Sequence, residues 1–430
     1  MTTLLIKNGR IIDPANKRDE VADILVEDGK IADCGRDLGA QADETIDATG
    51  KIVCPGFIDM HVHLREPGRE DKENIESGSR AAAAGGFTSI CPMPNTSPVV
   101  DSAQGLQFLL SRAREKSVVH ILPVAAVTQG QMGESITEFG DLVYYGAIAF
   151  SDDGNPIMNA EIMHRALEYT SMFNVPILDH CEDQMLAEGG QMRSGAMAMK
   201  LGLKGIPGAA NSCQVARDID LARYTGGRVH IQHLSVRASV EYIATAREKG
   251  INVTCEATPH HLTLTDACLE GYDTNYKMNP PLGSEDDRQA LLEGLRSGVI
   301  DCIATDHAPH TDMEKDQVFD QAPNGVLGME TAFGVCYTDL VLKKEIDLNL
   351  LIEKMTIAPA KILNLTKGTL SKGVDADITI LDLDHEYTVD AKQFFSRSSN
   401  CPWHGAKLKG RALYTIVDGR VVFENGSFRV

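Results

Sequence analysis

Short apolar runs alternate with amphipathic stretches through the middle of the chain. Helical spacing marks the stretches between the runs, for example ESGSRAAAAGG and DDRQALLEGLRSG. Eight such units over roughly 300 residues predict a (β/α)8 barrel of the TIM type. The eight predicted strands are GFIDMHV, FTSICPM, VHILPVAAV, GAIAFSDD, VPILDHCE, RVHIQHL, INVTCEATPH and IDCIATDHA.

Both ends of the chain show a different pattern. Runs such as TLLIKNGRIID, DILVEDGKIADCG and RALYTIVDGRVVFENGSF consist of β-branched residues broken by Gly or Asp-Gly, which is typical of hairpins. We therefore expect residues 1–54 and 368–430 to pair into one small composite β-sandwich. Residues 55–367 would form the barrel beside it.

Composition narrows the function class. The chain has 430 residues, 43% of them hydrophobic, which suffices for a large core and a smaller domain. Its formal net charge of −20 argues against nucleic acids and membranes as partners. No run of eighteen apolar residues and no signal peptide is evident. The ten cysteines lie singly, so we expect reduced thiols and a cytoplasmic protein that acts on a small-molecule substrate.

Imidazole and carboxylate side chains stand at the ends of five predicted strands. In a (β/α)8 barrel the chemistry lies at the carboxyl ends of the strands. His61 and His63 end the first strand, and period-two alternation points both to the same side. The other candidates are Asp153 at the fourth strand, His180 at the fifth, His233 at the sixth and Asp306 at the eighth.

A single histidine at a strand end is more often a structural residue than a ligand. We assign that role to His120, His164, His385 and His404, and a hydrogen-bonding or loop-shaping role to the pair His260 and His261. Five strand ends that each offer a ligand are much harder to explain by chance. Six ligands exceed the needs of one tetrahedral zinc and suit two divalent ions. Zinc fits this donor set best, with manganese, cobalt or iron as alternatives.

Such ions lower the pKa of a bound water and polarise a carbonyl group. A carboxylate beside them can take a proton and pass it to a leaving nitrogen. We choose Asp306 for this catalytic role because it ends the last strand and precedes the polar sequence HAPH.

Several longer motifs carry a family resemblance. They are PGFIDMHVHLREPG, MPNTSPV, FSDDG, HCED, TPHHLTLTD, NYKMNPPL and ATDHAPHT. Together they resemble the dihydroorotase family of the amidohydrolase superfamily, in its bacterial type I form, from Leu4 to about Val422. The resemblance implies a barrel with a composite β-sandwich. It also implies reversible conversion of L-dihydroorotate and N-carbamoyl-L-aspartate in pyrimidine biosynthesis.

The resemblance also implies roles for individual residues. His61, His63, His180 and His233 match metal ligands, Asp306 matches a ligand and general base, and Asp153 matches a carboxylate of this type. Arg65, Asn95 and His310 match contacts to the substrate carboxylate. Asn279 and the backbone at Asn324 and Gly325 match ring contacts, and the substrate-binding set also includes His63.

Two alternatives stay open. Hydantoinases, dihydropyrimidinases and allantoinases resemble a pattern with a carbamylated lysine at the fourth strand, but YYGAIAFSDDGNP has none. Some relatives are inactive scaffolds for aspartate carbamoyltransferase; the full ligand set here favours an active enzyme without excluding that partner. We expect a homodimer. Residues 307–328 are compatible with either an ordered lid or a mobile loop.

Overall fold

The structure is a computed structural model that describes residues 3–429. Its centre is a barrel of parallel strands that neighbour one another in chain order. The barrel strands are β6 (Phe57–Val62), β7 (Phe87–Pro92), β8 (His120–Ile121), β9 (Val124–Ala125), β10 (Ala149–Phe150), β11 (Ile177–Asp179), β14 (Val229–Ile231), β15 (Val253–Ala257) and β16 (Cys302–Ile303). The third strand is interrupted and appears as β8 and β9, so these nine pieces are the eight predicted strands.

The first and last strands close the barrel. Val62 bridges His307 in parallel, and the backbone N–H of His63 donates to the carbonyl of His307 at 2.9 Å. Beside this bridge the Asp59 carboxylate accepts hydrogen bonds from the backbone and the hydroxyl of Thr305, at 3.0 and 2.6 Å. The predicted barrel is therefore confirmed, and the ends of β6 and β16 meet at one mouth.

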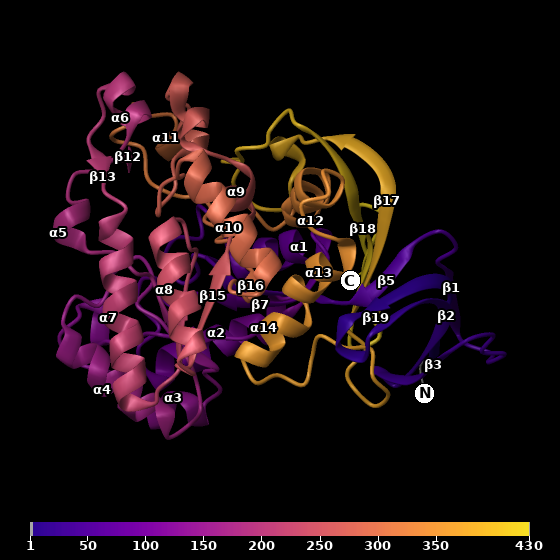
Figure 1. Ribbon diagram of the computed structural model, residues 1–430. Helices are drawn as coiled ribbons and strands as arrows, with labels where there is room; N and C mark the ends of the chain where they lie inside the picture. The colour runs from indigo at the N-terminus through magenta and orange to yellow at the C-terminus, as the bar shows by residue number, and fades with distance from the viewer. Residues whose placement is uncertain (1–2, 430) are drawn as a thin grey trace.

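Helices surround the barrel (Figure 1). Their ends follow local chemistry: Asn74 caps the first helix by accepting from Ser77 N–H at 2.8 Å, and Gly298 ends another helix at φ 81°. The main helices are α1 (Ile75–Ala84), α2 (Ala103–Lys116), α3 (Phe139–Tyr144), α4 (Ala160–Ser171), α7 (Ala209–Thr225), α8 (Arg237–Glu248), α10 (Glu285–Ser297), α13 (Leu348–Met355) and α14 (Ile357–Ile362).

A second sheet draws its strands from both ends of the chain. In Figure 1 the indigo N-terminal strands lie beside the yellow C-terminal ones. The nine strands are β1 (Thr3–Asp13), β2 (Arg18–Glu27), β3 (Lys30–Gly35), β4 (Glu44–Asp47), β5 (Ile52–Pro55), β17 (Ile378–Thr388), β18 (Lys407–Val417), β19 (Arg420–Glu424) and β20 (Ser427–Phe428). The two halves join where β5 pairs antiparallel with β17, with Pro55 opposite Ile378.

This sheet encloses a core separate from that of the barrel. Its apolar side chains come from both termini and include Ile6, Ile24, Val53, Ile378 and Ile416, all of them buried. Neither terminal segment could bury this surface alone, since each supplies only part of the cluster. The strands expected to form a composite β-sandwich thus belong to one nine-stranded sheet that has an apolar core of its own.

Short elements surround the mouth of the barrel. They are α5 (Gln184–Ala187), β12 (Met192–Arg193), α6 (Ala196–Leu201), β13 (Gly205–Ile206), α9 (Pro259–Thr263), α11 (Asp312–Lys315) and α12 (Ala332–Cys336). Across residues 3–429, no helix combines the length and apolarity that crossing a bilayer needs. All ten cysteines are free, and Cys91, Cys255 and Cys302 are buried as expected.

The junction between sheet and barrel makes a prediction about stability. Gly56 joins β5 to β6, and a Cβ at this position would lie 2.1 Å from Oγ1 of Thr88. We expect Gly56→Ala to lower the free energy of unfolding by about 1–3 kcal/mol, measured by urea denaturation, because a packed core resists added atoms. Gly39→Ala is the control, since a Cβ at Gly39 would meet nothing within 4 Å. Equal stability of the two variants would contradict the proposed clash.

Candidate metal centre

The six predicted ligands meet at the mouth of the barrel. All six side chains are buried, with exposed fractions between 0 and 6%. Each comes from the carboxyl end of a strand: His61 in β6 and His63 directly after it, Asp153 after β10, His180 after β11, His233 after β14, and Asp306 after β16. The structure thus brings together residues that are as far apart as 245 positions in the sequence (306 − 61).

Asp153 lies at the centre of this cluster. Its Oδ1 is 3.3 Å from Nε2 of His61, 3.5 Å from Nδ1 of His180 and 3.7 Å from Nε2 of His233. Its Oδ2 is 3.4 Å from Nε2 of His63. One carboxylate therefore lies within 3.7 Å of all four imidazoles and is the central donor of the predicted ligand set.

Asp306 completes the side of the cluster near β6. Its Oδ1 lies 3.2 Å from Nε2 of His63 and 3.5 Å from Nε2 of His61. On the opposite side, Nδ1 of His180 and Nε2 of His233 lie 2.9 Å apart. Two groups of possible ligands share His61: one with His63 and Asp306, the other with Asp153 and His233.

The donor set fits divalent metal ions. Nε2 of His61, Oδ1 of Asp153 and Nδ1 of His233 are buried and have no hydrogen-bond partner among the described residues. A buried polar atom without a partner is costly, and so is a cluster of buried charges. Divalent cations would satisfy these lone pairs and offset the carboxylate charges. Imidazole with carboxylate is a donor set that zinc favours.

Two ligands stand on strained backbone. His233 has φ 31° and Asp306 has φ 49°, and the neighbouring Arg65 has φ 59°. A residue with a side chain costs about 1–3 kcal/mol in such a conformation, and such residues concentrate at functional sites. The turn that follows each strand therefore directs the side chain into the mouth at the expense of local stability.

Glu256 supports the cluster from below and was missed in the sequence. Its Oε1 lies 2.9 Å from Nδ1 of His61, and its Oε2 lies 3.1 Å from Nε2 of His230. Burial opposes its charge, but these two imidazoles outweigh burial and lower the pKa of Glu256 to about 2. A carboxylate on the far ring nitrogen orients a ligating histidine. Its place near the carboxyl end of β15, one of the three barrel strands without a predicted ligand, is a signal the sequence contained.

Two amide side chains expected to bind substrate also contact ligands. Oδ1 of Asn95 lies 3.0 Å from Nδ1 of His63, and its Nδ2 donates to the Asp153 carbonyl at 3.3 Å. Nδ2 of Asn279 lies 3.3 Å from Nε2 of His180 and donates to Glu182 at 2.9 Å. Asn95 and Asn279 therefore orient the cluster, and their contacts with substrate stay predictions.

Electrostatics keep the central carboxylates ionised. Burial opposes the charge on Asp153, but His61, His180 and His233 outweigh it and hold the pKa of Asp153 well below its usual value. The pKa of Asp306 is likewise lowered, against burial, by His61 and His63. Both carboxylates are therefore available as ligands or proton acceptors at neutral pH.

A cavity of about 250 Å³ opens above the cluster. Every residue predicted to bind substrate lines it: His63, Arg65, Asn95, Asn279, His310, Asn324 and Gly325. Of the predicted ligands, Asp153, His180, His233 and Asp306 line it too. The structure thus places predicted metal ligands and predicted substrate contacts around one space of small-molecule size.

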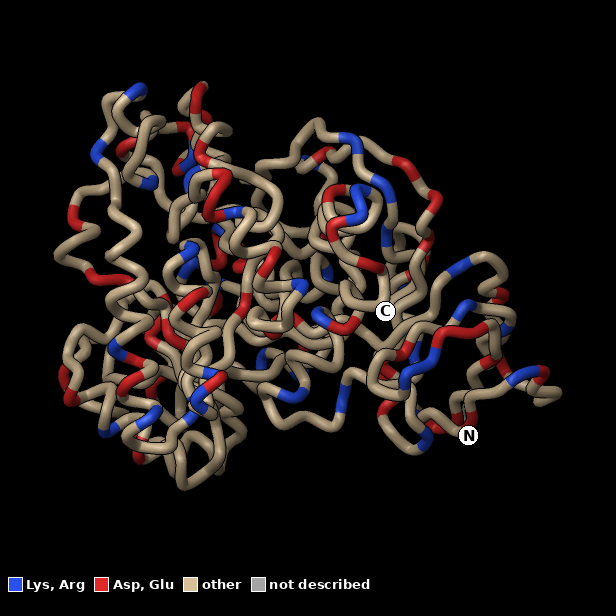
Figure 2. Tube along the Cα trace, in the orientation of Figure 1, with Lys and Arg blue, Asp and Glu red and all other residues tan. Residues whose placement is uncertain are grey.

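Arg65 gives this cavity a local positive charge. Its Nε donates to the Pro309 carbonyl at 3.3 Å, and no carboxylate among residues 3–429 forms an ion pair with it. Burial lowers the pKa of Arg65 to about 10, which still leaves it charged at neutral pH. The chain as a whole is acidic, with a formal net charge of −20, and Figure 2 shows acidic and basic positions interspersed along the trace. An unpaired, half-buried guanidinium is suited to a carboxylate.

His310 is held by hydrogen bonds on both ring nitrogens. Its Nε2 lies 2.9 Å from the Asn324 carbonyl, so Nε2 carries the proton. Its Nδ1 then accepts from Nζ of Lys72 at 3.2 Å, and Oε2 of Glu314 lies 3.3 Å from the same nitrogen. Lys72 was not singled out in the sequence, yet it contacts a ring that faces the cavity.

His260 and His261 differ in their hydrogen bonding. His261 is hydrogen-bonded as expected, to the Thr258 hydroxyl at 2.8 Å and the Pro280 carbonyl at 2.9 Å. For His260, neither ring nitrogen has a hydrogen-bond partner among the described residues, although the side chain is buried. Burial lowers the pKa of His260 to about 4, so it is neutral beside the cluster.

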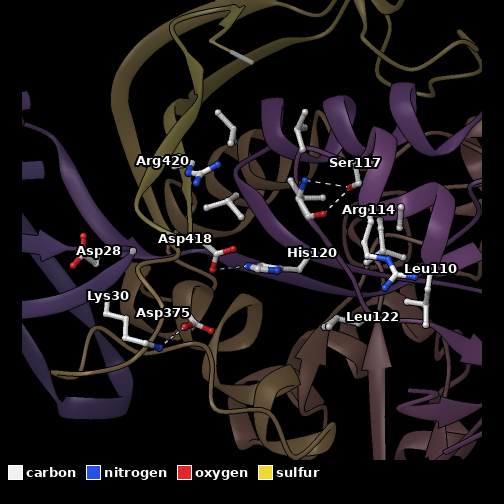
Figure 3. Close-up of a pocket in the computed structure, with 17 residues that line it drawn as sticks. Asp28, Lys30, Leu110, Arg114, Ser117, His120, Leu122, Asp375, Asp418 and Arg420 are labelled. Atoms are coloured by element: carbon white, nitrogen blue, oxygen red, sulfur yellow. Dashed lines mark hydrogen bonds and ion pairs between the residues drawn. The ribbon is translucent and has the colours of Figure 1, made fainter. Parts of the chain in front are cut away.

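A larger cavity, of about 920 Å³, lies away from this centre (Figure 3). It opens between α2, β8 and the turn from β18 to β19. His120 points toward Asp418 there, with Nε2 3.4 Å from Oδ1, and Lys30 pairs with Asp375 at 2.8 Å. His120 lies within 3.4 Å of carboxylate oxygens of Asp377 and Asp418, which agrees with the structural role expected of it.

Comparison with known proteins identifies the family. A family model described as dihydro-orotase-like matches residues 50–239, and an amidohydrolase family model matches residues 289–423. A dihydroorotase of Pelotomaculum thermopropionicum is 50% identical over 99% of this chain and 100% of its own. A dihydroorotase of Solibacter usitatus is 48% identical over 99% of both chains.

The chain belongs to the dihydroorotase family. Identity of this level over the whole length confirms the resemblance of the motifs, and with it an enzyme of the amidohydrolase superfamily that depends on metal.

Solved structures confirm the fold of this member of the dihydroorotase family. The L-hydantoinase (dihydropyrimidinase) of Arthrobacter aurescens superposes with a TM-score of 0.91 at 30% identity, covering 100% of this chain and 98% of its own. The dihydropyrimidinase of Brevibacillus agri gives a TM-score of 0.87 at 25% identity, covering 100% of this chain and 96% of its own. The fold is thus shared between cyclic amidases of different substrate choice, and the site has to distinguish them.

Glu256 allows a test of the support beneath the metal ligands. We expect Glu256→Gln to weaken metal binding about 10- to 100-fold, because an amide orients His61 less strongly than a carboxylate. Competition with a chromophoric chelator measures this affinity. Glu248→Gln, on the exposed surface of α8, is the matched control. Unchanged affinity in Glu256→Gln would show that His61 needs no such support.

Proposed function

We propose that this chain is a dihydroorotase that interconverts (S)-dihydroorotate and N-carbamoyl-L-aspartate in de novo pyrimidine biosynthesis. The observation that carries the proposal is the unpaired guanidinium of Arg65 in the same cavity as the carboxylates of Asp153 and Asp306. A cyclic amide that bears its own carboxylate has both parts that this cavity recognises. The full-length dihydroorotase relatives support the same choice.

We propose one or two zinc ions as the cofactor, held by His61, His63, His180, His233, Asp153 and Asp306. Bound ions would lower the pKa of a water molecule and polarise the amide carbonyl. The Asp153 carboxylate, within 3.7 Å of three imidazoles through Oδ1 alone, would hold the two subsites together.

Asp306 is the proposed general base. It is ionised at rest and lies at the cavity wall, so it can accept the proton of the attacking water. The C–N bond of the ring amide breaks, the hydroxyl joins the carbonyl carbon, and Asp306 returns the proton to the nitrogen. The reverse sequence closes the ring.

The Arg65 guanidinium and the hydrogen-bonding groups around the cavity would orient the substrate. Arg65 would form a charge-assisted pair with the substrate carboxylate. Asn95 and His310 would add contacts to that carboxylate, and Asn279 with the backbone at Asn324 and Gly325 would contact the ring. Because these groups hold the ring in one orientation, its amide carbonyl would face the carboxylate cluster.

The hydantoinase alternative rests on the fold it shares with this chain. Residues 144–156 contain no lysine that could be carbamylated, and Asp153 occupies the centre that such a group would fill. Arg65 also has no role toward an uncharged hydantoin ring. A homodimer, a contact with aspartate carbamoyltransferase and a cytoplasmic location stay predictions.

The first experiment measures turnover of L-dihydroorotate together with metal content. We expect activity that falls with chelation, returns with zinc, and exceeds activity on hydantoin or dihydrouracil. We expect Asp306→Asn to lose turnover by about 10³-fold or more while its circular dichroism spectrum is kept, because the proton acceptor is lost. Asp316→Asn, an exposed neighbour, is the control. Full turnover in the chelated enzyme would refute the proposal, and bicarbonate-dependent activation would favour a hydantoinase.

Arg65 gives a second prediction, on substrate choice. We expect Arg65→Met to raise KM about tenfold or more for dihydroorotate and to change KM little for dihydrouracil, which lacks the carboxylate. Steady-state kinetics on both substrates measures this. Arg114→Met, on the exposed face of α2, controls for loss of an arginine. An equal effect on both substrates would assign Arg65 to packing rather than to carboxylate binding.

A further inference from the structure

One segment outside the barrel reaches into the wall of the candidate site. Residues 394–401 lie between β17 and β18 of the composite sheet, and Figure 1 shows this yellow segment extending toward the barrel. The Ser396 hydroxyl donates to Glu73 at 2.5 Å, and the Ser398 hydroxyl donates to the Lys72 carbonyl at 2.8 Å. These contacts tie the segment to the loop that follows His63 and Arg65.

Asn400 is the residue of this segment that contacts the substrate loop. Its Oδ1 accepts from the backbone N–H of His310 at 3.1 Å. Its Nδ2 donates to the carbonyls of Ala308 and Gly325, each at 3.0 Å. Its own carbonyl accepts from Leu327 N–H at 2.9 Å. The amide is buried and fully satisfied, and only this orientation places the oxygen against an N–H group and the nitrogen against two carbonyls.

These contacts join the two limbs of one loop. Ala308 and His310 lie on the limb that leaves β16, and Gly325 and Leu327 lie on the limb that returns. Between the limbs, two buried lysines hold backbone carbonyls: Nζ of Lys315 contacts Gly325 at 3.0 Å, and Nζ of Lys277 contacts Ala322 at 2.7 Å. The loop is thus fixed from inside by lysines and from outside by Asn400.

The same limb holds Arg65. Pro309 lies between Ala308 and His310, the two residues that are hydrogen-bonded to the Asn400 side chain. The Pro309 carbonyl accepts a hydrogen bond from Nε of Arg65 at 3.3 Å. His310, on the other side of Pro309, presents its ring to the cavity. A shift of this limb would therefore move two of the groups that face the substrate carboxylate, while the metal ligands stay on their strands.

We propose that Asn400, supplied by the composite sheet domain, is a positioning residue that holds the 308–327 loop in its substrate-binding conformation. The proposal rests on the proposed function for its kinetic consequence, but not for its structural one. The composite sheet domain would thus take part in substrate recognition, because the barrel by itself does not contain the residue that holds the 308–327 loop.

Asn400→Asp tests the proposal with little change of shape. The variant keeps the acceptor for His310 N–H but turns a carboxylate oxygen toward the carbonyls of Ala308 and Gly325. We expect faster hydrogen exchange across residues 308–327 of the metal-loaded enzyme, and KM for dihydroorotate raised about tenfold or more. We expect metal content to be unchanged and KM for dihydrouracil to change little.

Asn425→Asp is the matched control, because Asn425 lies in an exposed turn of the same C-terminal segment. Asn400→Ser, which keeps one hydroxyl for one of the carbonyls, should show a smaller effect in the same direction and decides the matter if the aspartate variant does not fold. Unchanged exchange and unchanged KM in a metal-loaded Asn400 variant would overturn the proposal. If the parent enzyme does not turn over dihydroorotate, the proposed function fails, and hydrogen exchange alone still decides the role of Asn400.

Discussion

Six ionisable side chains are buried together at one end of the barrel, and the rest of the molecule is arranged around that constraint. In a low-dielectric interior, carboxylates and imidazoles without compensation are strongly destabilising. In this structure the Asp153 carboxylate lies near all four imidazoles, and the Glu256 carboxylate lies beneath His61. Each carboxylate thus compensates buried imidazoles. Three atoms of the cluster have no hydrogen-bond partner among the described residues: Nε2 of His61, Oδ1 of Asp153 and Nδ1 of His233. Both ring nitrogens of the nearby His260 also lack one.

The barrel supplies rigidity to that cluster. Strand ends are fixed by backbone pairing, so a side chain that leaves them is held more accurately than one on a free loop. Left-handed turns at His233 and Asp306 then direct two ligands inward. Substrate recognition is organised differently: Arg65 and His310 lie on loops, and those loops depend on contacts from elsewhere, including Lys72 and Asn400.

The separation of metal-site residues on strand ends from substrate-binding residues on loops suggests how one fold can act on several cyclic amides. The hydantoinase and dihydropyrimidinase that superpose on this chain share its barrel and its sheet. What differs has to lie in the strand-end ligands and in the loops over the cavity. An aspartate at the fourth strand and an unpaired arginine after the first are the two features of this chain that address those differences.

Much of the fold, and the grouping of the six predicted ligands, could be predicted from the sequence, because both follow from local patterns. The alternation of apolar runs and helical stretches specified the barrel, and polar residues at the ends of those runs specified His61, His63, Asp153, His180, His233 and Asp306. Carboxyl ends of barrel strands must meet at one mouth, so the position along each strand was sufficient. The reduced cysteines and the pairing of the two termini followed in the same way.

Other features depended on distances that no local pattern encodes. Glu256 resembles any acidic residue in a strand until the barrel places it against His61. His260 was expected to have a hydrogen-bonding or loop-shaping role, and both its ring nitrogens lack a hydrogen-bond partner among the described residues. Asn400 lies 90 residues from His310 in the sequence (400 − 310), and only the return of the chain from the sheet brings them together. Sequence periodicity determined which residues face inward along each element; tertiary packing alone decided which buried groups from different elements became partners.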